Sequence, residues 1–193
     1  KIRCTKVMNK SNVLFCCNLN VKYLSRSHSK PRSAYDSLNS IKNINFVEKI
    51  LNKRKINLTL RYLSKGENSG YFIEKKLLKK NIKYDGAENN LINEIQNYKL
   101  VIFENFFSTS FLESFSLNYP SIILSSKNDK ICFRKNFASH YENLKRVKIV
   151  HESQESIKVF LNKNIDSIEE WWHSIKVRKA LDKFKETYLK QTF

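Results

Sequence analysis

Three consecutive hydroxyl side chains, Ser108, Thr109 and Ser110, are the residues best placed to do chemistry in this sequence. They follow the apolar run 100–103 and precede the segment 111–119, in which apolar residues recur at helical spacing. The amides of a helix N-terminus bind anions, and neighbouring hydroxyls can add hydrogen bonds to the same oxygens. The triplet therefore predicts phosphate binding, with Thr109 donating to a pyrophosphate.

The segments around this triplet predict where it lies in the fold. Residues 100–103 form a short unbroken apolar run, typical of a strand buried on both faces. Pro120 ends the helix, and residues 122–124 return to the sheet, which gives a right-handed crossover between parallel strands. The triplet is then at the carboxyl end of a strand, where open α/β sheets bind ligands.

The rest of the chain repeats this alternation of strands and helices. It predicts one domain over residues 1–193, a Rossmann-like three-layer α/β sandwich with a mostly parallel sheet of about five or six strands. The expected strands are 12–19, 57–63, 82–84, 100–103, 122–124 and 147–150. The expected helices are 35–53, 72–80, 87–97, one after Ser110, 131–144, one capped by Ser153, and a closing helix at 167–190.

Two arginines follow or end predicted strands. Arg61 ends the strand 57–63, where such a residue serves either as a salt-bridge partner or as a phosphate ligand. Arg26 lies in the basic loop after the strand 12–19, which opens into the ligand crevice if that strand is central. It is either a phosphate or acceptor contact or a solvated loop charge.

Glycine-rich phosphate loops are excluded. The sequence has neither GxGxxG nor GxxxxGK[ST], and no glycine follows Gly86. Any phosphate cradle must therefore use a helix N-terminus and hydroxyls.

The four cysteines indicate no metal. Cys4, Cys16, Cys17 and Cys132 form no CxxC pair and have no histidine at zinc spacing, and the sequence has no Asp-x-Asp motif. We expect Cys16 and Cys17 to be buried, reduced thiols of an intracellular protein, and neither a metal nor another cofactor is predicted.

The formal net charge of +18 has two explanations that stay open. Lysines accompany many Asn and Ile residues in every segment, as biased base composition would produce. Alternatively, the charge serves an anionic partner, either nucleic acid or a membrane surface. The sequence lacks the signatures of RNA-recognition sheets, so no specific nucleic acid is expected.

The segment around the triplet also carries a family resemblance. Residues 107–114, FSTSFLES, and 118–123, NYPSII, resemble the nucleotide-binding segment of GT-B glycosyltransferases and related glycerophosphotransferases. More narrowly, the chain resembles a bacterial family of transferases from surface-carbohydrate loci, with further matches at 60–62, 151–156 and 168–172. The similarity covers most of the chain. Residues 64–71, SKGENSGY, depart from the more aromatic loop of that family.

The resemblance implies roles for further residues. Glu113 would bond the ribose of a nucleotide donor, although its spacing from Ser110 also predicts a structural capping box. Asp85 and Gly86 would lie near the ribose and base, or would form an ordinary strand-to-helix turn. The adjacent Trp171 and Trp172 cannot both point at one core, so we expect one to pack on its own domain and the other against a neighbouring surface.

The predicted function is the binding of a nucleotide-sugar donor in a glycosyltransferase-like enzyme of surface polysaccharide synthesis. The resemblance implies the C-terminal half of a GT-B fold, a missing N-terminal domain that holds a carbohydrate or lipid-linked acceptor, and a catalytic base in that missing domain. The expected location is the cytoplasm, with or without peripheral contact at the inner membrane. The competing prediction is a non-enzymatic basic module that binds RNA or an anionic membrane surface.

Overall fold

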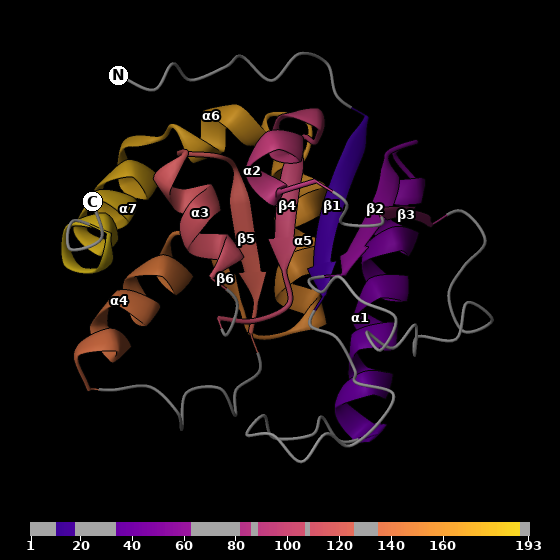
Figure 1. Cartoon of the computed structure of the whole chain (residues 1–193), viewed down its shortest axis with the longest axis horizontal. Coiled ribbons are helices and arrows are strands. Elements are labelled where there is room, and N and C mark those ends of the chain that lie inside the picture. Colours follow the sequence, from indigo (N-terminus) through magenta and orange to yellow (C-terminus); the bar gives the residue numbers. More distant parts are fainter. Residues whose placement is uncertain are drawn as a thin grey trace.

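Six parallel strands form one sheet in the part of the chain that the structure describes. The structure is a computed structural model, and it describes residues 11–17, 34–62, 82–85, 89–106, 109–125 and 135–189 (Figure 1). The strand order is β3-β2-β1-β4-β5-β6, and every neighbouring pair is parallel. The strands are β1 (Asn12–Cys17), β2 (Asn57–Tyr62), β3 (Lys83–Asp85), β4 (Leu100–Phe103), β5 (Ser121–Leu124) and β6 (Val150–His151).

Helices cover both faces of this sheet. Figure 1 shows α2 and α3 on the near side of the strands, and α5 on the far side. The helices are α1 (Ala34–Asn52), α2 (Leu91–Glu94), the 3-10 helix η2 (Ile95–Asn97), α3 (Ser110–Ser116), α4 (Lys135–Arg146), α5 (Gln154–Asn164), α6 (Ile168–Trp172) and α7 (Ile175–Tyr188).

Alternation along the strands divides the core into two halves. In β1, Val13, Phe15 and Cys17 pack with α1 and α5, whereas Leu14 and Cys16 pack with the helices of the opposite face. Because successive side chains of a strand point to opposite faces, a strand covered on both sides must be apolar throughout. The predicted three-layer α/β sandwich is therefore confirmed, and the sheet is parallel at every described pairing.

The predicted boundaries hold well for the strands 12–19, 57–63, 100–103 and 122–124, which the structure ends within two residues. The last strand is shifted, since it covers only Val150–His151 instead of 147–150. The reason is the left-handed backbone of Lys148, with φ of 67°, which places a turn before the strand. The predicted helix 72–80 lies outside the described residues.

The predicted closing helix at 167–190 is wrong as a single helix. The structure has α6 and α7, separated at Ser174, whose backbone is extended with φ of −60° and ψ of 147°. The side chain of Ser167, at the N-cap of α6, makes no capping hydrogen bond. The indole of Trp172 donates to the carbonyl of Asn118 at 2.8 Å, which fixes α6 before the chain turns into α7.

The predicted cap of α5 is confirmed. The hydroxyl of Ser153 accepts a hydrogen bond from the Ser156 amide at 3.2 Å, and its backbone is extended as an N-cap requires. The sequence signal was local here, so it did not depend on any distant packing.

Candidate functional site

The order in which the chain adds strands to the sheet reverses between β1 and β4. β1 pairs with β2 on one side and with β4 on the other, so the connections run outward in opposite directions from this point. Open α/β sheets bind ligands outside the carboxyl ends of the strands at such a switch point. The carboxyl edge around β1 and β4 is therefore the candidate site.

A row of polar side chains crosses this edge on the β1, β2 and β3 side. Cys16 stands opposite Arg61, and Arg61 stands opposite Asp85 in the strand register. The Arg61 Nη1 atom lies 2.6 Å from the Asp85 Oδ2 atom, and Arg61 Nη2 donates to the carbonyl of Asn89. Arg61 is only 4% exposed, so its charge lies beneath the edge of the sheet and is already bonded. The salt-bridge role predicted for Arg61 is thus present in the structure.

The electrostatics of this row keep its titratable neighbours neutral. Burial raises the pKa of the Cys16 thiol to about 12, although the positive charge of Arg61 opposes this shift. Burial also raises the pKa of Tyr98, and the carboxylates of Asp85 and Glu94 raise it further. Since the thiolate is the nucleophilic form of cysteine, Cys16 is a buried structural thiol and no nucleophile.

Two polar residues directly after β4 form the other half of the candidate site. Glu104 and Asn105 are both buried. The hydroxyl of Ser40 in α1 donates to the Glu104 Oε1 atom, and the Glu104 amide donates to the Cys16 carbonyl at 3.2 Å. A buried carboxylate therefore lies at the switch point, attached to β1 and α1.

The sequence reasoning missed Glu104, Asn105 and Ser40. A usable signal existed for the first two, because two polar residues that directly follow a buried parallel strand must lie at its carboxyl edge. Nothing local marked Ser40, which lies in the middle of a helical pattern and 64 residues from its partner Glu104.

Two residues of the hydroxyl triplet, Thr109 and Ser110, stand at the start of α3, and the helix begins one residue earlier than a cap by Ser110 would place it. Ser110 is the first residue of α3, and Thr109 stands at the N-cap position with φ of −67° and ψ of −19°. Because that backbone is helical, the Thr109 side chain makes no cap; its carbonyl accepts from the amides of Leu112 and Glu113. The capping box predicted for Ser110 and Glu113 is therefore wrong in register.

Five of the predicted site residues are among the described residues, and three are not. Arg61 and Asp85 are in direct contact, whereas Thr109, Ser110 and Glu113 lie two strands away, after β4. Thr109 is exposed, and Ser110 and Glu113 are half-buried. Three predicted residues lie outside the described residues: Ser108, Arg26 and Gly86.

Within the described ranges, no three His, Cys, Asp or Glu side chains gather as a metal site would require. None of the described helices has the length and apolar character needed to cross a membrane.

The fold and the candidate site define a class: a Rossmann-like α/β domain with buried polar groups at its switch point. The sequence identifies the family. Residues 2–192 match the model of the LIC12162 family transferase, and the chain belongs to that family. No curated protein matches the sequence significantly. A solved structure of the MAR1 ribonuclease from Caenorhabditis elegans is similar at 12% identity and a TM-score of 0.43, over 86% of this chain and 91% of the other. So distant a likeness says nothing about activity.

Proposed function

We propose that this chain is the donor-binding domain of a glycosyltransferase-like enzyme that uses a nucleotide sugar in surface polysaccharide synthesis. The observation that carries the proposal is the switch point between β1 and β4, where parallel α/β domains bind nucleotides. Membership of a transferase family supports the reaction class. The sugar and surface-polysaccharide assignments rest on the resemblance of residues 107–123 to GT-B glycosyltransferases.

In this proposal the donor diphosphate lies against the segment between β4 and α3. Ser108, Thr109 and Ser110 donate hydrogen bonds to its oxygens, and the exposure of Thr109 leaves that side chain accessible. Glu113 binds the ribose, while Asp85 and Gly86 lie near the base.

The two arginines have different parts in the proposal. Arg61 acts through its positive charge and by holding Asp85, because its guanidinium is already bonded to protein atoms. Arg26 is assigned to phosphate or acceptor contact, as expected for a basic loop that follows a central strand.

The proposed mechanism is positioning plus electrostatic stabilisation of the leaving group. An acceptor hydroxyl oxygen forms a bond to the anomeric carbon of the donor sugar, and the bond from that carbon to the diphosphate oxygen breaks. The diphosphate leaves with the bonding electron pair, and the acceptor proton passes to a base on the N-terminal domain. Hydrogen-bond donors placed where negative charge develops accelerate such a step. No metal or cofactor is assigned.

The test is calorimetric titration of the folded chain with UDP, GDP, CDP and ADP and with their sugar conjugates. We expect saturable binding of one nucleotide and a loss of about tenfold in affinity for Thr109→Ala, the range of one hydrogen bond to a charged group. Ser116→Ala is the matched control, because Ser116 is an exposed hydroxyl at the other end of α3. Equal nucleotide affinities of Thr109→Ala and Ser116→Ala would contradict a phosphate site at the start of α3. If the chain bound no nucleotide, the proposal of a donor-binding domain would be overturned.

A further inference from the structure

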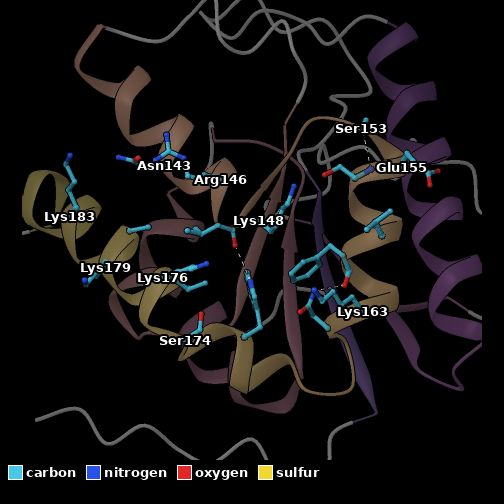
Figure 2. Close-up of a pocket in the computed structure, with 18 residues that line it drawn as sticks. Asn143, Arg146, Lys148, Ser153, Glu155, Lys163, Ser174, Lys176, Lys179 and Lys183 are labelled. Atoms are coloured by element: carbon cyan, nitrogen blue, oxygen red, sulfur yellow. Dashed lines mark hydrogen bonds between the residues drawn. The ribbon is translucent and has the colours of Figure 1, made fainter.

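A basic groove lies between α5 and α7, closed at one end by α4 and the turn before β6. Its volume is about 1140 Å³. Figure 2 shows Lys176, Lys179 and Lys183 along α7 on one side, Lys163 from α5 on the other, and Lys148 between them. This basic groove is built from elements other than those of the candidate nucleotide site.

The charge of the basic groove is almost entirely of one sign. Its lining has a single acidic side chain, Glu155, and both oxygens of that carboxylate lie 3.1 Å from Lys158, which is outside the lining. Among the described residues, no salt bridge involves any of its six basic side chains, which are Arg146, Lys148, Lys163, Lys176, Lys179 and Lys183. Six cations without acidic partners raise the local potential and attract a polyanion.

The two helices α5 and α7 that line the basic groove each also have an exposed apolar residue on the same helix face as a lysine. Val159 on α5 is 59% exposed and lies four residues before Lys163; Ile175 on α7 is 74% exposed and lies four residues before Lys179. Residues four apart share a helix face. Val159 and Ile175 are the two most exposed large apolar residues among those described. Val159 lines the basic groove, and Ile175 lies between the lining residues Ser174 and Lys176.

The aromatic residues of the lining are already used in packing. Phe160 and Trp171 contact each other edge to face, with ring centroids 4.6 Å apart, and Phe160 is buried. The indole N–H of Trp171 donates to the Val147 carbonyl at 3.2 Å. Proteins that bind single-stranded nucleic acids stack bases on exposed aromatic rings. The groove offers cations and exposed aliphatic side chains instead, which is the combination that binds a lipid interface.

We propose that the basic groove docks this protein on a membrane surface that contains anionic phospholipids. Headgroup phosphates occupy the groove between Lys163 and the lysines of α7, while Val159 and Ile175 insert at the boundary of headgroups and acyl chains. This proposal stands apart from the nucleotide proposal, because it uses different helices and requires no donor.

The test is co-sedimentation of the intact chain with phosphatidylcholine vesicles, with and without phosphatidylglycerol. We expect binding only to the vesicles with phosphatidylglycerol. The double variant Lys176→Glu, Lys179→Glu should bind at least about tenfold more weakly, since each basic residue near an anionic surface adds a substantial part of the affinity. Ile175→Ser should weaken the binding that persists at raised salt, because insertion is not screened.

Matched controls separate the groove from the overall charge of the chain. Lys42→Glu, Lys49→Glu changes two exposed lysines of α1 and gives the same net charge as the groove variant. Leu38→Ser removes another exposed apolar side chain, 50% exposed, from the same helix. Both should bind vesicles nearly as the native chain does.

Three results would overturn the proposal: no sedimentation of the native chain with anionic vesicles, equal losses in the groove and α1 variants, or binding of single-stranded RNA in place of vesicles. Circular dichroism and thermal unfolding of each variant keep a folding defect from being mistaken for lost binding.

Discussion

Arg61 and Asp85 stand opposite each other near the carboxyl ends of neighbouring parallel strands and form an ion pair with 2.6 Å between Nη1 and Oδ2. The pair is buried on the arginine side, with 5% of that side chain exposed, and is mostly covered on the aspartate side. It joins the end of β2 to the end of β3, and the bond from Arg61 to the Asn89 carbonyl extends this connection to the residues before α2.

We expect Arg61→Met to destabilise the protein by about 3 kcal/mol, because it removes the ion-pair partner of a largely buried carboxylate. The double variant Arg61→Met, Asp85→Leu should cost less than the sum of the two single changes, since no buried charge is left. Urea unfolding of the four proteins gives the coupling energy.

The control for this double-mutant cycle is the exposed ion pair of Lys158 and Glu155 on α5. Lys158→Met should cost less than about 1 kcal/mol, as exposed ion pairs do. If Arg61→Met cost no more than this control, the pair would contribute little to the stability of the fold.

His151 makes the stability of the protein depend on pH. Its ring is fully buried, and its pKa is lowered from 6.5 to about 4, mainly by burial and also by the positive charge of Lys148, while hydrogen bonds with Lys148 and Ser156 oppose the shift. In the unfolded chain the imidazole of His151 therefore binds a proton near pH 6.5, whereas in the folded chain it binds one only near pH 4. The contribution of the neutral His151 is fully present above pH 6.5, and the free energy of unfolding should fall by about 3 kcal/mol as the pH decreases through this window.

The measurement is the free energy of unfolding in urea at several pH values. His151→Gln should flatten the slope between pH 6.5 and 4, whatever its absolute stability. His173→Gln, which changes an exposed imidazole, should leave the slope unchanged. An unaltered slope in His151→Gln would show that other groups cause the acid sensitivity.

The thiols of Cys16 and Cys17 should react only when the protein unfolds. Both side chains are at most 1% exposed. The pKa of Cys16, raised from 9.0 to about 12 by burial, leaves about a thousandfold less thiolate below pH 9. In a chain with Cys4→Ser and Cys132→Ser, labelling by a chromogenic disulfide reagent should follow the unfolding curve in urea. Rapid labelling of the native chain would contradict the buried position of β1.

The same shift predicts alkaline sensitivity. The unfolded Cys16 thiol ionises near pH 9.0, whereas the folded thiol keeps its proton until about pH 12. Its contribution to stability is therefore present below pH 9 and should be lost as the pH rises through this interval. Replacement of Cys16 by Ala should remove that part of the pH dependence.

The two adjacent tryptophans should differ in their effect on stability. Trp172 is fully buried and bonded to Asn118, while Trp171 is half-buried and packs against both core clusters. Trp172→Ala should cost about 3–5 kcal/mol, and Trp171→Ala clearly less. Urea unfolding measures both, and equal costs would contradict the unequal burial. Packing of one tryptophan within its own domain is confirmed; a contact of the other with a neighbouring surface stays a prediction.

Local sequence determined the elements and their order. The run 100–103 predicted a strand buried on both faces, because four successive apolar residues fill both sides of a pleat, and β4 has all four of these residues buried. The Ser153 cap was equally local, since its partner Ser156 is three residues away. For the same reason the fold class was predicted correctly, as alternating strands and helices permit few other architectures.

The tertiary structure alone decided which distant groups meet. Arg61 is bonded to Asp85, Ser40 is bonded to Glu104 across 64 residues, and the break at Ser174 divides the predicted closing helix. The basic groove exists only because α5 and α7 lie on either side of it, so that lysines distant in the sequence line one groove. Hydrophobic periodicity specifies which face of a helix is buried, but the neighbour of a polar side chain depends on strand order and on helix packing, which no local pattern encodes.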